Sequence, residues 1–93
     1  MSVVIIGGNE RMEFQYKQIC KRYGCKAKIF TKMPGNFRNQ IGSPDLMILF
    51  TNTVSHKMVC SALLEAQRNN ARVERCHSSS SCALKNILEG HCC

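Results

Sequence analysis

Two segments of the sequence place a histidine beside hydroxyl, amide or thiol side chains where an extended run gives way to a helical pattern. They are Thr51-Asn52-Thr53-Val54-Ser55-His56 and Arg75-Cys76-His77-Ser78. A neutral imidazole or a thiolate is a ligand for haem iron or a transition metal. Hydroxyl and amide groups hold a ligand by hydrogen bonds. Because Ser55 alone would cap a helix, the three further small polar residues before it favour contact with a ligand.

His56, Cys76 and His77 are the candidate ligands to iron or a metal ion. His56 falls in the first turn of a predicted helix, where the helix dipole disfavours imidazolium and a neutral ring is expected. His77 has the equivalent position after the following strand. Ordinary surface histidines are the competing interpretation.

Catalytic residues are not expected in this chain. Cys76 and His77 would suit a thiolate and its base, but adjacent strand residues point to opposite sides and no third group orients them. Glu10 is the only acid near the polar segments, and Asp45 precedes its strand at the opposite end. We therefore predict that the protein is not an enzyme. A phosphotransfer or hydrolytic enzyme that uses Cys76 or His77 is the remaining alternative in that class.

A third candidate segment is Gly7-Gly8-Asn9, directly after the apolar run Val3–Ile6. Glycine lets a backbone approach a ligand closely, and the helix that follows offers its N-terminus to an anion. The spacing is not that of a dinucleotide fingerprint, because Glu10 and Arg11 stand where further glycine would be needed. A tight turn between strand and helix is the simpler explanation of the glycine pair.

The net charge of +7 is unevenly distributed along the chain. Residues 1–38 contain eight Lys or Arg against two Glu, a net of +6, whereas residues 39–93 contain five against four acids, a net of +1. A solvated basic face and an anionic partner explain this imbalance equally well. Arg11, Lys32 and Arg38 are the basic residues expected to reach carboxylates or phosphates.

The sequence indicates a cytoplasmic protein with reduced thiols. It starts without a basic region, its first apolar run is too short for a signal peptide, and no apolar run approaches the ~20 residues that span a membrane. The seven cysteines are an odd number and fit neither CxxC pairs nor a zinc-finger spacing. Cys20 and Cys60 are expected to be small core residues.

The hydrophobic pattern predicts one domain over residues 1–93, with the last three residues as a frayed tail. The expected strands are Val3–Ile6, Lys26–Phe30, Asp45–Phe50 and Arg72–Arg75. The expected helices are Arg11–Tyr23, Ser55–Asn69, a helix from Ser80 or Ser81 to a stop at Gly90, and a short helix around Asn36–Ile41. The expected end signals are an N-cap at Asn9, an N-cap at Ser55 and a left-handed stop at Gly24.

This order predicts an α/β fold, a small Rossmann-like three-layer sandwich. Its four-stranded parallel sheet has the order 2-1-3-4, with helices on both faces. The first and third strands then lie side by side while their connections leave in opposite directions, which opens a crevice at a topological switch point. We expect Gly7-Gly8-Asn9 and Thr51–His56 to form its two lips, with Cys76-His77-Ser78 beside it.

These residues resemble the bacterial family catalogued as domain of unknown function 2325, over roughly Val3 to Leu88. The resemblance rests on Val4-Ile5-Ile6-Gly7-Gly8 with Arg11, on Val54-Ser55-His56, and on Arg75 with Ser78-Ser79. It implies a small Rossmann-like domain and points, residue by residue, to Gly7, Gly8, Arg11, Ser55, His56, Arg75 and Ser78. Members often have histidine where this chain has Asn9, so the resemblance does not imply a metal ligand there.

Together these observations predict a non-enzymatic cytoplasmic module, a homodimer, that binds an anionic small molecule at the carboxyl ends of the strands. Haem is the first candidate, and the absence of a CxxCH motif means that it would be bound non-covalently. The axial ligand of the haem iron would be His56, His77 or Cys76. The haem propionates would pair with Arg11, Lys32 and Arg38. The apolar wall of the pocket would be formed by Met12, Met33, Met58 or Phe37. A bare transition-metal ion is the second candidate. A nucleic-acid-binding or regulatory protein that uses the basic N-terminal half is the alternative.

Overall fold

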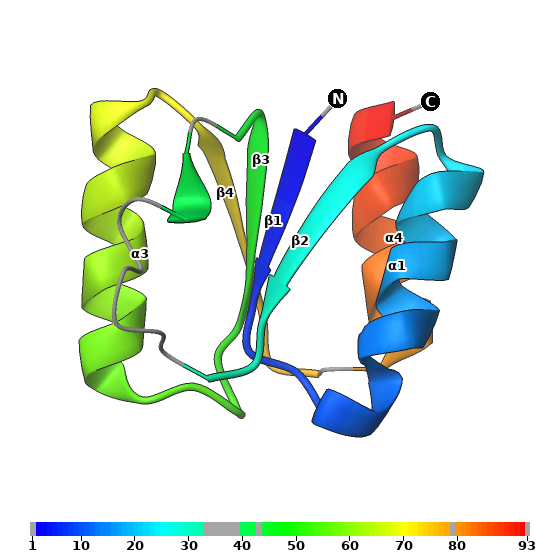
Figure 1. Ribbon diagram of the computed structural model, residues 1–93, viewed down its shortest axis with the longest axis horizontal. Helices are drawn as coiled ribbons and strands as arrows, with labels where there is room; N and C mark the ends of the chain where they lie inside the picture. The colour runs from blue at the N-terminus through cyan, green and yellow to red at the C-terminus, as the bar shows by residue number, and fades with distance from the viewer. Residues whose placement is uncertain (1, 33–39, 43, 79, 93) are drawn as a thin grey trace.

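A four-stranded parallel sheet forms the centre of this protein (Figure 1). The structure is a computed structural model that describes residues 2–32, 40–42, 44–78 and 80–92, without the side chains of residues 91 and 92. The sheet order is β2-β1-β3-β4, and in Figure 1 α3 covers one face while α1 and α4 cover the other. The predicted α/β fold and sheet order are therefore confirmed.

The strands agree with the sequence pattern to within one residue at either end. They are β1 (Ser2–Ile6), β2 (Lys26–Phe30), β3 (Leu46–Phe50) and β4 (Arg72–Cys76). The continuous apolar runs of β1 and β3 occupy the two central positions, where a strand is buried on both faces. Lys26 and Lys28 are exposed on β2, which confirms its predicted place at an edge.

Alternate residues of the central strands enter two separate cores. Val3 and Ile5 point toward α1 (Glu13–Arg22) and α4 (Ser81–Cys92), and Val4 and Ile6 point toward α3 (His56–Arg68). The first core also contains Tyr16, Ile19, Cys20, Cys25, Leu46, Ile48, Phe50, Leu84 and Leu88. The second also contains Phe30, Ile41, Met47, Leu49, Met58, Ala62 and Ala66. Burial on both faces fixes the register of the strands that carry the polar loops.

The first helical segment has the predicted start and stop. It begins with one 3-10 turn, η1 (Glu10–Met12), and continues as α1. The Asn9 side chain accepts a hydrogen bond from the Arg11 N–H at 3.0 Å, so Asn9 is the N-cap. Gly24 has a φ of 72° and closes the helix with two hydrogen bonds, from the Cys25 N–H to the Cys20 carbonyl and from its own N–H to the Lys21 carbonyl.

Serine hydroxyls start the two later helices. The Ser55 hydroxyl accepts from the Met58 N–H at 3.2 Å and begins α3, as predicted. The Ser80 hydroxyl accepts from the Ala83 N–H at 3.2 Å and begins α4. The predicted stop at Gly90 is wrong, because α4 continues through Gly90 to Cys92. A single helical glycine costs only about 1 kcal/mol relative to alanine, so it does not by itself end a helix.

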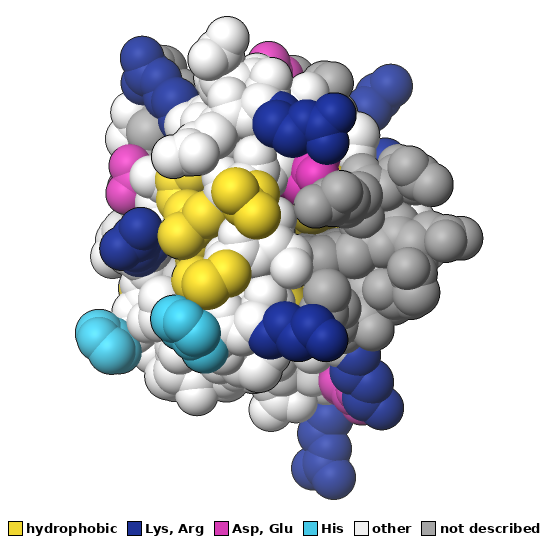
Figure 2. Space-filling view, turned by 90° about the vertical axis from the view of Figure 1, so that its left-hand side faces the viewer, with side chains coloured by type: hydrophobic (Ala, Val, Ile, Leu, Met, Phe, Trp, Pro, Cys, Tyr) yellow, Lys and Arg dark blue, Asp and Glu magenta, His cyan; other side chains and the backbone are white. Residues whose placement is uncertain are grey.

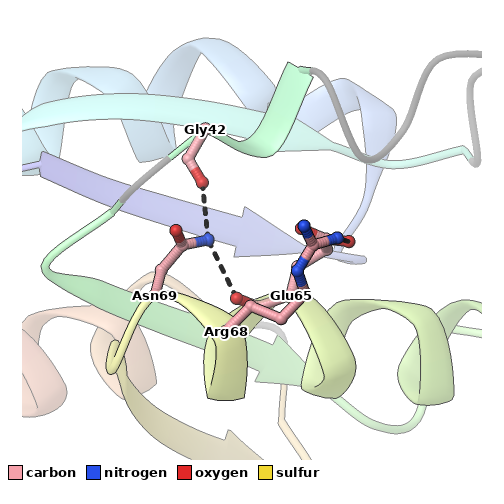
Figure 3. A network of polar contacts seen from close by, with 4 residues as sticks. All are labelled: Gly42, Glu65, Arg68 and Asn69. Carbon is pink, nitrogen blue, oxygen red and sulfur yellow. Dashed lines mark hydrogen bonds and ion pairs between the residues drawn. The ribbon is translucent and has the colours of Figure 1, made fainter.

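The end of α3 is tied to the segment that crosses the sheet before β3 (Figure 3). The Asn69 side-chain amide donates to the carbonyls of Gly42 and Glu65, both at 2.9 Å. Of the predicted short helix around Asn36–Ile41, Gln40 and Ile41 are helical and the rest lies outside the described residues. None of the described helices combines the length and the apolar character that crossing a membrane requires.

Candidate functional site

The candidate residues meet along the carboxyl edge of the sheet. The parallel register pairs Ile6 with Leu49 and Phe50 with Cys76, so β1, β3 and β4 end side by side. Residues 7–9, 51–56 and 77–78 follow these three strand ends directly. The predicted grouping of the polar segments at one edge is therefore what the fold produces.

The two predicted lips are in direct contact. The Gly8 N–H donates to the Thr53 hydroxyl at 2.7 Å, and that hydroxyl donates to the Phe50 carbonyl at 3.0 Å. A Cβ on Gly7 would lie 2.5 Å from Val54 Cγ1 and 2.8 Å from Thr53 Oγ1. The side chains of Thr53 and Val54 therefore occupy the space between β1 and β3 in which a ligand was expected.

The glycine pair is explained by this packing. Gly7 and Gly8 have φ values of 96° and 89°, a region in which side chains are disfavoured. A Cβ on Gly8 would lie 2.7 Å from the Tyr16 ring. Both glycines thus let the backbone approach side chains of the protein itself. This agrees with the simpler explanation of the glycine pair, a tight turn between strand and helix.

The loops after β3 and β4 meet where Thr51 contacts His77. Thr51 donates its N–H to the Cys76 carbonyl at 2.9 Å, and its hydroxyl lies 3.4 Å from both that carbonyl and His77 Nδ1. When the hydroxyl donates to the carbonyl, its oxygen accepts from Nδ1–H. In that arrangement the Thr51 hydroxyl orients the ring of His77, whose side chain is exposed.

His56 has a different partner. Its Nε2 lies 3.5 Å from the sulfur of Cys60, one helical turn further along α3, and both side chains are exposed. The prediction that Cys60 is a core residue is therefore wrong, whereas Cys20 is buried as predicted. Cys60 follows the buried Met58 by two residues, about 200° around the helix, and so faces solvent. The four-residue spacing of His56 and Cys60 is the feature of the sequence that could have predicted their contact on one face of the helix.

The three predicted metal ligands are used in different ways. Cys76 is partly buried and packs against the core beneath α1 and α4. His77 contacts Thr51, and His56 contacts Cys60. Among the described residues, no group of three or more His, Cys, Asp or Glu side chains is arranged to hold a metal ion.

Of the other residues predicted to contact a ligand, four are exposed at the surface and one forms hydrogen bonds within its own loop. Asn52, Ser55, Arg11 and Arg75 are exposed. The Ser78 hydroxyl donates to the Ser80 hydroxyl at 3.1 Å and accepts from the Ser80 N–H at 3.3 Å, so it shapes the loop before α4.

Several residues expected to surround haem have other surroundings. Met58 is buried in the core beneath α3, and Met12 packs against the opposite core. Lys32 forms an ion pair with Glu10 at 3.1 Å. Met33, Phe37 and Arg38 lie outside the described residues.

The surface over α3 combines hydrophobic and histidine side chains. Figure 2 looks onto this side and shows two histidine side chains near one end of it, beside a group of hydrophobic side chains. Leu64 on α3 is 53% exposed, a high fraction for a large apolar side chain. This face therefore differs from the mainly polar surface expected of a helix that only covers a core.

Comparison with known proteins identifies the family. Residues 2–91 match the model of a family described as an uncharacterized protein conserved in bacteria (DUF2325). The chain belongs to the DUF2325 family. The resemblance inferred from the Gly-Gly and Val-Ser-His segments is thereby confirmed over nearly the whole chain.

The fold of this DUF2325 domain also occurs in a solved structure. A de novo designed Rossmann fold protein is similar with a TM-score of 0.62 over 95% of this chain and 93% of that chain, at 10% sequence identity. At that identity the likeness shows the fold alone. A comparison with curated proteins found no match.

Proposed function

We propose that this DUF2325 domain is a non-enzymatic cytoplasmic module that binds an anionic small molecule at the carboxyl ends of β3 and β4, with haem as the first candidate. The observation that supports this most directly is the contact between the Thr51 hydroxyl and His77 Nδ1. A hydrogen bond at Nδ1 fixes the ring and its tautomer and leaves Nε2 to bind iron. Because Thr53 fills the gap between β1 and β3, the proposed ligand lies over the β3 and β4 ends.

The charges around this edge favour an anion. Arg75 at the end of β4 and Lys57 in the first turn of α3 are both exposed. Arg11 is exposed after β1, whereas the nearby Glu10 is paired with Lys32. The N-terminus of α3 adds a partial positive charge. These groups are suitable partners for propionate or other carboxylate groups.

A hemin titration tests the proposal. The protein should give a Soret shift that saturates at one equivalent, and His77→Ala should abolish it. Thr51→Val should weaken binding by about 10–100-fold, the usual cost of removing a partner that orients a ligand. His91→Ala, which removes the third histidine of the chain, is the matched control and should bind as the parent does. A full shift that survives in both His77→Ala and His56→Ala would disprove these ligand assignments.

A bare transition-metal ion is the second candidate ligand, and homodimerisation is part of the same proposal. The small size of the domain, which limits the surface that one chain can bury, is the argument for association of two chains. Elemental analysis and an absorption spectrum of freshly purified protein distinguish metal from haem, and light scattering gives the oligomer. A colourless, metal-free protein that binds neither added hemin nor added metal would contradict both ligand candidates.

Nucleic-acid binding remains the alternative, and one structural observation favours it. Lys17 of α1 and Lys28 of β2 line a surface hollow of about 350 Å³ along the edge strand, together with Glu13, which forms an ion pair with Lys17 at 3.8 Å. Lys26 is exposed on the same strand. Binding through these charges should weaken steeply as salt rises, because each phosphate contact releases counterions. An affinity that is flat between low and moderate salt, or unchanged in Lys26→Glu with Lys28→Glu, would rule this out.

A further inference from the structure

His56 and Cys60 form a pair of potential metal ligands on the solvent-facing side of α3. The two residues are four apart, so their side chains lie one above the other on the helix surface. The ring nitrogen Nε2 and the sulfur are 3.5 Å apart, and both residues are exposed. A thiol and an imidazole are the two side chains that zinc and related divalent ions select.

The separation of the two atoms matches the geometry of a tetrahedral ion. With Zn–S of about 2.3 Å, Zn–N of about 2.05 Å and a tetrahedral angle, the sulfur and nitrogen of two ligands lie about 3.5–3.6 Å apart. The observed 3.5 Å agrees with this value. The two atoms are therefore at a separation that one tetrahedral ion can bridge.

The rest of the protein offers no equivalent pair among the described residues. Cys20 and Cys25 are buried and Cys76 packs against a core. Cys82 is exposed near the start of α4, but the residues four before and four after it, Ser78 and Asn86, are not metal ligands of this kind. Cys82 therefore provides a control for an exposed thiol without an imidazole beside it.

We propose that His56 and Cys60 are a two-residue chelating site for a divalent transition-metal ion of the zinc type. Binding replaces the S–H bond of Cys60 with an S–metal bond and releases one proton to solvent. Nε2 of His56 donates its lone pair, and no electrons are transferred. Because a tetrahedral ion takes four ligands, two coordination positions then remain for water or for a ligand from another molecule. This site shares His56 with the candidate haem ligands, but it uses neither Thr51 nor His77, and Cys60 is not among the candidate haem ligands.

Cobalt(II) is the probe for the test, because a cobalt–thiolate bond has a near-ultraviolet charge-transfer band. Titration of the reduced parent protein with Co²⁺ should produce this band at one equivalent, and excess Zn²⁺ should remove it. Cys60→Ser should abolish the band. His56→Gln should weaken Co²⁺ binding by about 10–100-fold or more. Loss of a residue that only orients a metal ligand already costs that much, and His56 is a direct ligand. Cys82→Ser should leave both the band and the affinity unchanged.

The alternative is an S–H···N hydrogen bond that brings the two atoms together without a metal. In that case Co²⁺ gives no thiolate band, or the band persists in Cys60→Ser, and either result overturns the proposal. Circular dichroism of each variant checks that the helix is intact, and a Cys60→Ala with His56→Ala double variant provides a second metal-free reference. Since His77→Ala should keep Co²⁺ binding and Cys60→Ser should keep hemin binding, failure of one site is distinguishable from failure of the other.

Discussion

Gly7 provides the most quantitative test of the contact between the two strand-end loops. Replacing it with alanine forces a side chain into a φ of 96°, which costs about 1–2 kcal/mol in a left-handed conformation. The new Cβ would also lie 2.5 Å from Val54 Cγ1 and 2.8 Å from Thr53 Oγ1. Overpacking of this kind typically costs a further about 1–3 kcal/mol. We therefore expect Gly7→Ala to lose about 2–5 kcal/mol of unfolding free energy.

This loss is large for a chain of 93 residues. A domain of this length has a total stability of about 5–14 kcal/mol. With an m-value of about 2 kcal/mol/M, the urea midpoint should fall by about 1–2.5 M. Urea unfolding followed by circular dichroism measures this directly.

Two other glycines serve to separate the cost of backbone conformation from the cost of crowding. Gly24 has a φ of 72°, but a Cβ added there would meet no atom within 4 Å, so Gly24→Ala should lose only about 1–2 kcal/mol. Gly90 lies within α4 with equally open surroundings, so Gly90→Ala should gain up to about 1 kcal/mol. In a Val54→Ala background the Gly7→Ala penalty should shrink, because Cγ1 is gone. If Gly7→Ala costs no more than Gly24→Ala, and Val54→Ala does not change its cost, the proposed crowding is refuted.

Three further predictions follow from capping, core packing and thiol exposure. Ser55→Ala should lower the free energy of unfolding by about 1 kcal/mol, because the Met58 N–H loses its acceptor. Ser55→Asp should retain most of the stability, because its carboxylate can also accept from that N–H. Equal losses in the two variants would contradict the cap. Leu84→Ala should cost about 2–5 kcal/mol in urea unfolding, because Leu84 is fully buried beneath α4, and a loss below about 1 kcal/mol would show that α4 is not packed as described. A thiol reagent at neutral pH should label Cys60 and Cys82 before Cys20, and peptide mass mapping that found Cys20 first would contradict the burial pattern.

The elements of this fold were predictable because their signals are local. An unbroken apolar run specifies a strand buried on both faces, as in β3, and the four-residue rhythm of α3 specifies its buried side. Caps act within three or four residues, so Ser55 and Gly24 mark boundaries without reference to the rest of the chain. The stop at Gly90 failed because glycine permits a helix end without requiring one, and α4 continues where the next residues can still form helix.

The candidate site was predictable only in outline. Parallel strands and right-handed crossovers place residues 7–9, 51–56 and 77–78 on one edge, and the sequence is sufficient for that step. Which of these groups touch one another depends on side-chain length and strand register. Thr53 reaches across to Gly8, and Thr51 reaches His77, through contacts that join residues far apart in sequence.

The sequence by itself thus determined the α/β class, the sheet order, the helix starts and the edge on which the polar residues gather, since periodicity, capping and chain connectivity are readable from neighbouring residues. Only the tertiary structure decided that the space between β1 and β3 is filled by Thr53 and Val54, that Met58 belongs to a core, and that the Thr51 hydroxyl lies beside His77 Nδ1. These outcomes depend on how side chains from different strands and helices share a limited volume. The same packing turns Cys60 outward toward His56.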